Sequence, residues 1–277
     1  MLKIKIHQKN PYVTANTNRF SGFAKNYDRF RPSVPKEIVK ILTQLAHVTK
    51  ARRVVDIGCG TGLSTRIWAK YADEVVGIEP NDDMRHQAEL HSDNSNIHYQ
   101  KGLSISTGLP NNFADILTIV EAFHWMEPIN TLKEISRVLR PGGVFAAIDY
   151  DWTPTINPKA EKLDLAFEDN AKKLLNERGY DKAARRWPKK EHIFQIEKSG
   201  LFKSIKEIIV SGKEIGDYNR MIGLAINQSN IQILFKKGIS EEKIGLPIFR
   251  KKMKCLLGEE LHPMYFTFHI RLGIKPQ

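Results

Sequence analysis

The sequence has little of what marks secreted, membrane-spanning or metal-stapled proteins. Among 277 residues there are two cysteines, Cys59 and Cys255, too few for a disulfide framework or a four-cysteine zinc site. No apolar run approaches the roughly 18–20 residues of a membrane span. Residues 1–7 alternate lysine with aliphatic residues instead of forming a signal-peptide core. We therefore expect a cytoplasmic protein, a monomer or homodimer, that does not enter a membrane.

Charge is distributed unevenly along the chain. The formal net charge is +12, and the excess of lysine and arginine falls in residues 1–50 and 151–277, whereas residues 51–150 are acidic. Basic flanks attract nucleic acid or an acidic substrate, or they form an ordinary lysine-rich surface. The basic stretches 184–190 and 250–254 contain one aromatic residue, Trp187, and no recognisable RNA-binding module surrounds them. The sequence therefore does not favour a nucleic-acid partner.

Apolar runs alternate with amphipathic segments in the first 150 residues. Short β-branched runs predict buried strands at 53–58, 74–79, 97–100, 114–120 and 144–149. Amphipathic segments predict helices at 35–50, 63–71, 82–91 and 132–139. Two further strands, at 202–210 and 264–273, are separated by helical sequence. The pattern predicts a doubly wound α/β fold with a seven-strand, mostly parallel sheet and helical cap insertions.

The first predicted strand runs into a glycine-rich loop. Gly58, Gly60 and Gly62 alternate with other residues before the next helix, and glycine lets the backbone turn sharply and approach a ligand closely. A dinucleotide fingerprint would need its third glycine at position 63, where Leu63 stands. The carboxylate of Asp56 would repel a pyrophosphate but suits a ligand with an amino group. The loop therefore predicts a ligand site that does not bind a nicotinamide or flavin dinucleotide.

Glu79 ends the second predicted strand. In doubly wound sheets an acid at this position accepts hydrogen bonds from ribose hydroxyls. The alternative is a solvent-exposed glutamate at a strand end. Together with the glycine loop, Glu79 favours a nucleoside without a 2′-phosphate.

These segments resemble the class I S-adenosylmethionine-dependent methyltransferases, in particular the small-molecule, type 11 subgroup. The resemblance rests on residues 55–62, 76–84, 109–125 and 137–143 and on an N-terminal stretch at 20–32. It covers residues 20–150 well and the remainder in outline. It implies the cofactor S-adenosyl-L-methionine, with S-adenosyl-L-homocysteine as the product, and it does not identify the acceptor.

The resemblance also assigns roles to individual residues. It places Glu79 at the ribose, Asp56 at the ammonium, directly or through water, and Tyr27 and Arg31 at the methionine carboxylate. An acid that reads the adenine amino group in the family is replaced here by Ser104. The expected cofactor contacts are Tyr27, Arg31, Asp56, Gly58, Cys59, Gly60, Thr61, Gly62, Glu79, Pro80, Met84, Ser104, Glu121 and Trp125. No metal ligands are expected, because the histidines show no metal-binding spacing.

Four regions follow from this reading. Residues 1–34 are expected to cover the cofactor, and residues 35–150 to bind it. Residues 151–200 are expected to form a helical cap insertion. Residues 201–277 contain the last two strands, with a second helical insertion at 217–258.

The expected reaction is methyl transfer to an oxygen or nitrogen of a small-molecule acceptor. His124 follows the fourth strand, where the crevice opens, and its pKa class suits a general base. The alternative is a purely structural histidine. Glu121 is a second catalytic candidate. Two other functions stay open: an RNA methyltransferase that uses the basic flanks, and a non-catalytic subunit that binds the cofactor.

Overall fold

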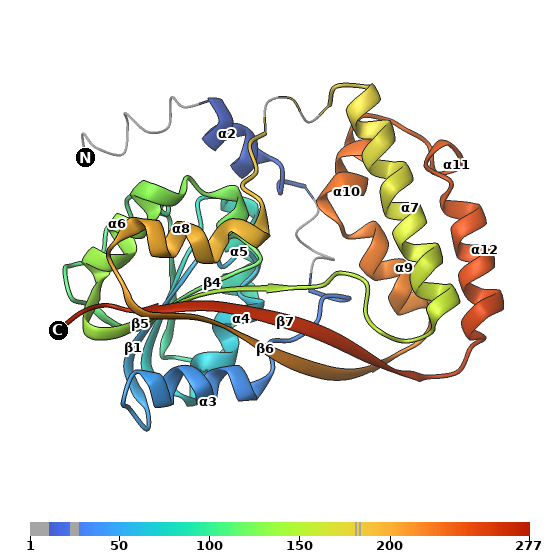
Figure 1. The fold of residues 1–277 in the computed structure, drawn as a ribbon. Helices are drawn as coiled ribbons and strands as arrows, with labels where there is room; N and C mark the ends of the chain where they lie inside the picture. The colour runs from blue at the N-terminus through green and yellow to red at the C-terminus, as the bar shows by residue number, and fades with distance from the viewer. Residues whose placement is uncertain (1–10, 23–27, 181, 183) are drawn as a thin grey trace.

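The computed structural model describes residues 11–22, 28–180, 182 and 184–277. Seven strands form one sheet in the order β3-β2-β1-β4-β5-β7-β6 (Figure 1). The strands are β1 (Ala51–Ile57), β2 (Ala72–Ile78), β3 (Ile97–Gln100), β4 (Ala114–Val120), β5 (Leu139–Tyr150), β6 (Lys203–Gly216) and β7 (His262–Ile274). Only β7 runs antiparallel to its neighbours β5 and β6. The expected seven-strand, mostly parallel α/β sheet is confirmed.

Helices pack on both faces of the sheet. Those of the sheet domain are α3 (Lys36–Leu45), α4 (Leu63–Arg66), η2 (Ile67–Lys70), α5 (Asp82–Leu90), η3 (Phe123–Trp125), α6 (Pro128–Val138), η4 (Lys189–Glu191) and α8 (His192–Ser199). One buried apolar cluster includes α3 and η2 through Ile38 and Trp68. The other cluster includes α6 and α8 through Leu132 and Ile196. In the described part of the chain, no helix is both long and apolar enough to cross a membrane.

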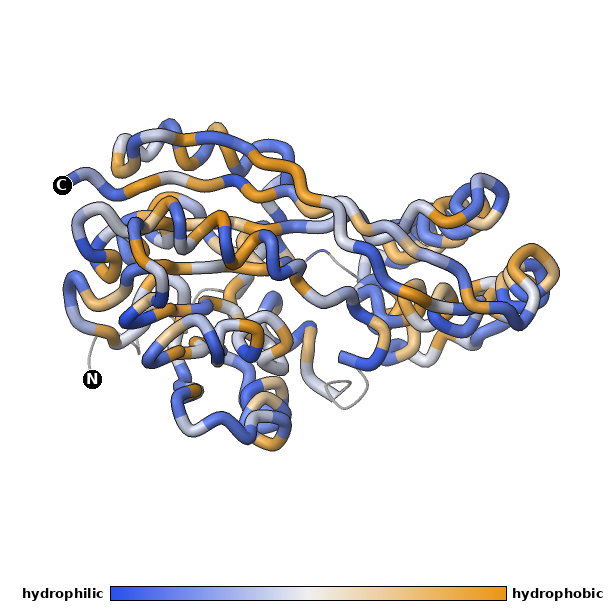
Figure 2. The backbone as a smooth tube through the Cα atoms, turned by 90° about the horizontal axis from the view of Figure 1, so that it is seen from below, coloured by the Kyte–Doolittle hydropathy of each residue, from blue (hydrophilic) through white to orange (hydrophobic). Residues whose placement is uncertain are grey.

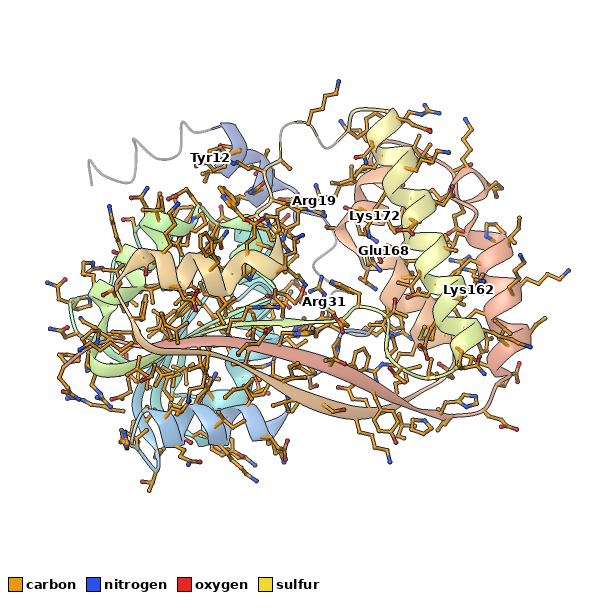
Figure 3. All side chains as sticks on the ribbon, in the orientation of Figure 1. Tyr12, Arg19, Arg31, Lys162, Glu168 and Lys172 are labelled. Atoms are coloured by element: carbon orange, nitrogen blue, oxygen red, sulfur yellow. The ribbon has the colours of Figure 1, made fainter. Side chains whose placement is uncertain are left out.

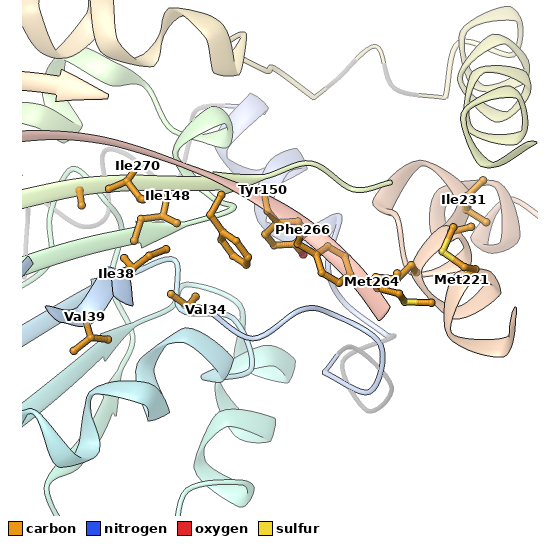
Figure 4. Close-up of a cluster of buried hydrophobic side chains, with 14 of the residues drawn as sticks. Val34, Ile38, Val39, Ile148, Tyr150, Met221, Ile231, Met264, Phe266 and Ile270 are labelled. Atoms are coloured by element: carbon orange, nitrogen blue, oxygen red, sulfur yellow. The ribbon is translucent and has the colours of Figure 1, made fainter. Parts of the chain in front are cut away.

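β6 and β7 extend beyond the other five strands of the sheet to a second body of helices. This cap consists of α7 (Pro158–Glu177), α9 (Tyr218–Ile226), α10 (Ser229–Lys236), α11 (Glu241–Ile244) and α12 (Leu246–Leu257). The view from below shows the sheet domain and the cap connected by the two long strands (Figure 2). Figure 4 shows buried side chains from Ile38 through Tyr150 and Phe266 to Met221. The cap is therefore packed onto the sheet through a shared apolar core.

The region 151–200 does not form a single cap insertion. α7 contacts α12 and α10 in the cap, but α8 contacts α6, β6 and β7 on the sheet. The reason is that α8 buries Ile196 in the apolar cluster on this side of the sheet and His192 beside Asp149 of β5. The helix expected at 63–71 also differs, because it divides into α4 and the 3-10 turn η2.

Candidate functional site

A cavity of about 410 Å³ opens at the carboxyl ends of β1, β2 and β4. The order of the strands reverses between β1 and β4, and this is where doubly wound sheets bind their ligands. α2 (Pro11–Asn18) and residues 31–34 contribute to its walls. The expected site residues that line it are Arg31, Gly58, Cys59, Gly60, Thr61, Glu79, Pro80, Met84, Ser104, Glu121 and Trp125.

The glycine loop needs its glycines for different reasons. Gly58, Gly60 and Gly62 have φ of 70°, 55° and 80°, a left-handed region that disfavours other residues. A Cβ at Gly58 would lie 2.8 Å from Ala122 Cβ, and one at Gly62 would lie 2.3 Å from the hydroxyl of Tyr99. A Cβ at Gly60 would meet nothing within 4 Å. Gly60 therefore presents bare backbone to the cavity, whereas the other two glycines permit close packing behind it.

Asp56 is held by hydrogen bonds within the protein. Its side chain is fully buried and does not line the cavity. Its carboxylate accepts hydrogen bonds from Ser64 Oγ (2.7 Å), Thr65 Oγ1 (2.7 Å) and Thr118 Oγ1 (2.9 Å). Burial raises the pKa of this carboxyl, although the three hydroxyls lower it. Asp56 therefore ties β1 to α4 and β4 beneath the loop, and a contact with a ligand's ammonium group stays a prediction.

Glu79 does reach the cavity. Gly60 N–H donates to Oε2 at 2.9 Å and Asn81 N–H donates to Oε1 at 2.8 Å. The side chain is 8% exposed, and this burial raises its pKa to about 7. Each carboxylate oxygen has a second lone pair for a ligand. The carboxylate is thus held beside the exposed backbone of Gly60, where it can accept hydrogen bonds from a diol.

The N-terminal segment lies against the glycine loop. Thr61 donates a hydrogen bond to Asp28, and Arg66 forms an ion pair with the same carboxylate at 2.7 Å. Arg31 is buried, lines the cavity and donates to the hydroxyl of Tyr150 at 3.5 Å. Figure 3 shows Arg31 on the side of the sheet that faces the cap. Tyr27, the other residue expected at the carboxylate, lies outside the described residues.

The basic stretch at 184–190 packs over the cavity together with α2. Asn16 Nδ2 donates to the carbonyl oxygens of Trp125 and Arg185, both at 2.8 Å. The guanidinium carbons of Arg186 and Arg19 lie 4.3 and 4.8 Å from the centre of the Trp125 ring. Such cation–π contacts stabilise the side chains that make them. This part of the basic sequence therefore packs against Asn16 and Trp125, two residues that line the cavity.

A cluster of ionisable groups lies behind the cavity at the ends of β4 and β5. Glu121, which has φ of 51°, lines the cavity and binds Lys189 Nζ at 2.6 and 2.8 Å. Asp149 binds His192 Nδ1 at 3.0 Å and Arg271 at 3.1 Å. His124 Nδ1 lies 3.6 Å from Asp149 Oδ1. The cluster joins residues that are far apart in sequence and connects the cavity wall to β7.

His124 is a buried member of this cluster, and three of the cluster's side chains are close enough together to bind a metal ion. His124 is 12% exposed, and burial lowers its pKa, which neighbouring Asp149 partly offsets. It does not line the cavity, whereas Glu121 does. Ligand atoms of Glu121, His124 and Asp149 lie within 4.8 Å of one another, as in a metal site. The ammonium of Lys189 already supplies a positive charge there.

Several residues that line the cavity were not singled out from the sequence: Tyr12, Asn16, Ser64 and Tyr150. Phe20, which belongs to the N-terminal stretch expected to cover the cofactor, lines it as well. Tyr150 had a detectable signal, because it ends β5 at the same edge of the sheet. The α2 residues had none, because α2 carries no amphipathic pattern. Gly62 was expected as a contact but does not line the cavity.

Comparisons with known proteins agree with this architecture. Residues 55–147 match the family model described as a methyltransferase domain. An uncharacterised methyltransferase of Mycobacterium tuberculosis is 37% identical over 127 residues, which cover 45% of this chain and 49% of that protein. One of Schizosaccharomyces pombe is 29% identical over 185 residues, covering 66% of this chain and 70% of that protein.

The matches differ in extent. This chain spans about half the length of the first curated relatives that it matches. A solved structure from Anaeromyxobacter dehalogenans, assigned as a type II methyltransferase, has a TM-score of 0.65 and 21% identity. That match covers 90% of this chain and 100% of the other. At this identity the likeness shows a shared fold.

Proposed function

We propose that this chain, whose residues 55–147 match a methyltransferase domain, is a class I S-adenosylmethionine-dependent methyltransferase that methylates an oxygen or nitrogen of a small-molecule acceptor. The observation that carries the proposal is the pairing of Gly60 with Glu79. Bare backbone and a buried carboxylate are joined by a 2.9 Å hydrogen bond at one wall of the cavity. A nucleoside needs both features, a close approach for its sugar and acceptors for its hydroxyls.

S-adenosylmethionine, when bound, supplies a methyl group on a positively charged sulfur that is already activated for displacement. Glu79 would hold the ribose, and Met84 and Pro80 offer apolar contact to the adenine. Ser104, which shares a hydrogen bond of 2.9 Å with Thr131, provides a polar atom nearby. Arg31 is the buried cation at the opposite wall, and its two-point geometry suits a carboxylate. Asp56 supports the loop from below.

The acceptor would occupy the end of the cavity formed by Glu121 and Tyr150. Holding a nucleophile in line with the methyl group accounts for much of the acceleration in such reactions. An alcohol or ammonium nucleophile must also lose a proton. Glu121 is the carboxylate that reaches the cavity from this cluster, so we assign it contact with the acceptor. His124 and Lys189 act through it as positioning residues.

Calorimetry with S-adenosylhomocysteine tests cofactor binding. We expect binding to the parent protein and to His124→Asn, and weaker binding to Glu79→Gln. NADH should give no heat, because Leu63 replaces the glycine that a dinucleotide needs. An absence of heat with both S-adenosylmethionine and S-adenosylhomocysteine would contradict the proposal.

A mass-spectrometric screen of metabolites tests the acceptor. We expect a small molecule to gain a methyl group, with an anionic acceptor favoured by the arginines around Trp125. Once an acceptor is known, Glu121→Gln should lower kcat by about 10²–10⁴-fold if it takes the proton. His124→Asn should shift the acidic limb of the pH–rate profile if it positions Glu121. Labelled methyl incorporated into RNA would favour the RNA methyltransferase alternative, which the packing of Arg185 and Arg186 on aromatic rings argues against.

A further inference from the structure

β6 is an edge strand of unusual length. It is the last strand in the sheet order and pairs only with β7 among the described strands. Its unpaired edge therefore offers a row of backbone donors and acceptors to another strand. Figure 1 shows β6 following the outer edge of the sheet as far as the cap.

Apolar side chains lie exposed on one face of this strand. Ile209 is 63% exposed and Ile215 is 52% exposed, and both alternate with Ser211 and Lys213. Because side chains alternate between the two faces of a strand, these four residues share one face with Glu207. Tyr265 of β7, opposite Lys213 in the register, is 42% exposed. A long edge strand with exposed apolar side chains is a template for pairing with another strand.

The sequence of β6 is complementary to itself when read in reverse. Antiparallel pairing of two copies about a twofold axis at Val210 places Glu207 opposite the second copy's Lys213. It also places Lys206 opposite Glu214 and Ile205 opposite Ile215. Opposite charges and apolar pairs that face each other across strands stabilise a sheet.

Neighbouring registers lose this complementarity. The nearest registers that keep the same face of each sheet on one side are shifted by two residues. They place Glu207 opposite Ser211 in one direction and opposite Ile215 in the other. Both lose the pairs of opposite charge, so the charge pattern favours the register centred on Val210.

The side chains needed for pairing are positioned at the surface. Glu207 Oε1 accepts from Arg271 at 2.9 Å and from His269 at 3.2 Å. Its Oε2 has no hydrogen-bond or ion-pair partner among the residues that the structure describes, and the side chain is 34% exposed. Lys213 is exposed, with its Nζ 5.9 Å from the centre of the Tyr265 ring. Glu214 is held by Ser33 N–H and by Arg220, so the pair that it forms with Lys206 is secondary.

We propose that a second copy of this chain docks on β6, joining the two sheets edge to edge about a twofold axis at Val210. Glu207 pairs with Lys213 of the other copy twice in this arrangement, as the symmetry of an isologous interface requires. Ile215 gains Ile205 of the other copy as a cross-strand neighbour, and Ile209 gains Ser211. This association does not depend on the proposed methyl transfer.

Sedimentation velocity over a range of protein concentrations tests the association. We expect a dimer for the parent protein and a dissociation constant at least tenfold higher for Lys213→Glu, which opposes two carboxylates. Ile209→Lys should have a similar effect. Lys252→Glu makes the same change of charge on α12 in the cap and should leave the dimer intact. A parent protein that is monomeric throughout, or a dimer that both β6 variants leave unchanged, would overturn the proposal.

Cysteine cross-linking tests the register, in a Cys255→Ser background because Cys255 is the exposed thiol and Cys59 is buried. Val210→Cys places two thiols directly opposite each other, at about the 5.5 Å between Cα atoms that a disulfide spans. Ile208→Cys places its thiols four residues apart along the seam, about 13 Å. We expect V210C to form a covalent dimer on mild oxidation and I208C to remain uncoupled. Coupling of I208C and not V210C would exclude this register.

Discussion

The ionisation of Glu79 offers the sharpest test of the cofactor site. Burial raises its pKa to about 7, so about a tenth of the molecules carry the carboxylate at pH 6 and about nine-tenths at pH 8. Only the ionised form accepts hydrogen bonds through both oxygens from a ribose diol. The affinity for S-adenosylhomocysteine should therefore rise about tenfold between pH 6 and pH 8.

The stability of the ligand-free protein should change in the opposite direction. The folded-state pKa lies above the ordinary value of 4.5, so the contribution of Glu79 is most favourable below pH 4.5. It is lost as the pH rises through about 7. At about 1.4 kcal/mol for each pKa unit, ionisation in the empty site costs about 3 kcal/mol. Ligand binding should offset this cost increasingly as the pH rises.

Glu79→Gln removes both effects. The amide offers one acceptor oxygen, and its NH₂ group faces the N–H of Gly60 or Asn81. The loss of hydrogen bonds to a charged acceptor corresponds to about 2–4 kcal/mol, or about 30–1000-fold in affinity. Glu74→Gln is the matched control, since Glu74 lies on the same strand, pairs with Arg53 and is outside the cavity.

Calorimetry and thermal denaturation at pH 6, 7 and 8, with and without S-adenosylhomocysteine, measure these effects. The reasoning would be refuted by an affinity that is equal at pH 6 and pH 8. It would also be refuted if Glu79→Gln bound as tightly as the parent protein and kept the same pH dependence.

Three further changes test other parts of the site. Gly60→Val places a side chain at φ of 55° and into the cavity, so calorimetry should show at least about 100-fold weaker binding of S-adenosylhomocysteine while circular dichroism shows a folded protein. Asp56→Asn leaves one acceptor oxygen for three hydroxyls, so urea denaturation should show a loss of about 1–3 kcal/mol, larger than any loss of ligand binding energy. Lys189→Met leaves the buried carboxylate of Glu121 without the cation that binds both of its oxygens, whereas Asp149 keeps Arg271, and should cost about 3–5 kcal/mol by the same assay. Adding Glu121→Gln to Lys189→Met should recover part of that loss, because it removes the unpaired carboxylate. An unchanged denaturation midpoint for Lys189→Met alone would contradict the role of the cluster.

Local patterns predicted the part of the molecule that local forces determine. β4 was predicted to its end residues, because an unbroken apolar run with turns on both sides is buried on both faces of a parallel sheet. Glu79 was found by its place at a strand end, and the structure brings it to Gly60. Such features depend on residues that are close in sequence or on a regular sheet edge.

Other features depend on contacts that periodicity does not encode. α8 was predicted as part of the same helical cap as α7, but it packs on the sheet and not in the cap. Glu121, Asp149 and Lys189 meet only because β4, β5 and η4 converge. A side chain's partners across the fold decide its role, and no spacing rule along the chain supplies them.

Asp56 shows why a motif found in the sequence does not by itself determine the role of each of its residues. Its position before the glycines was identified from the sequence, and a carboxylate at that position can face either a ligand or the protein. The choice is made by Ser64, Thr65 and Thr118, whose hydroxyls occupy both carboxylate oxygens. Since a buried carboxylate with three such donors gains nothing by turning toward solvent, the loop above it stays fixed. We therefore expect Glu79 and the backbone of Gly60 to contact the ligand. Glu79 has a second lone pair on each carboxylate oxygen, and Gly60 has open space on the cavity side.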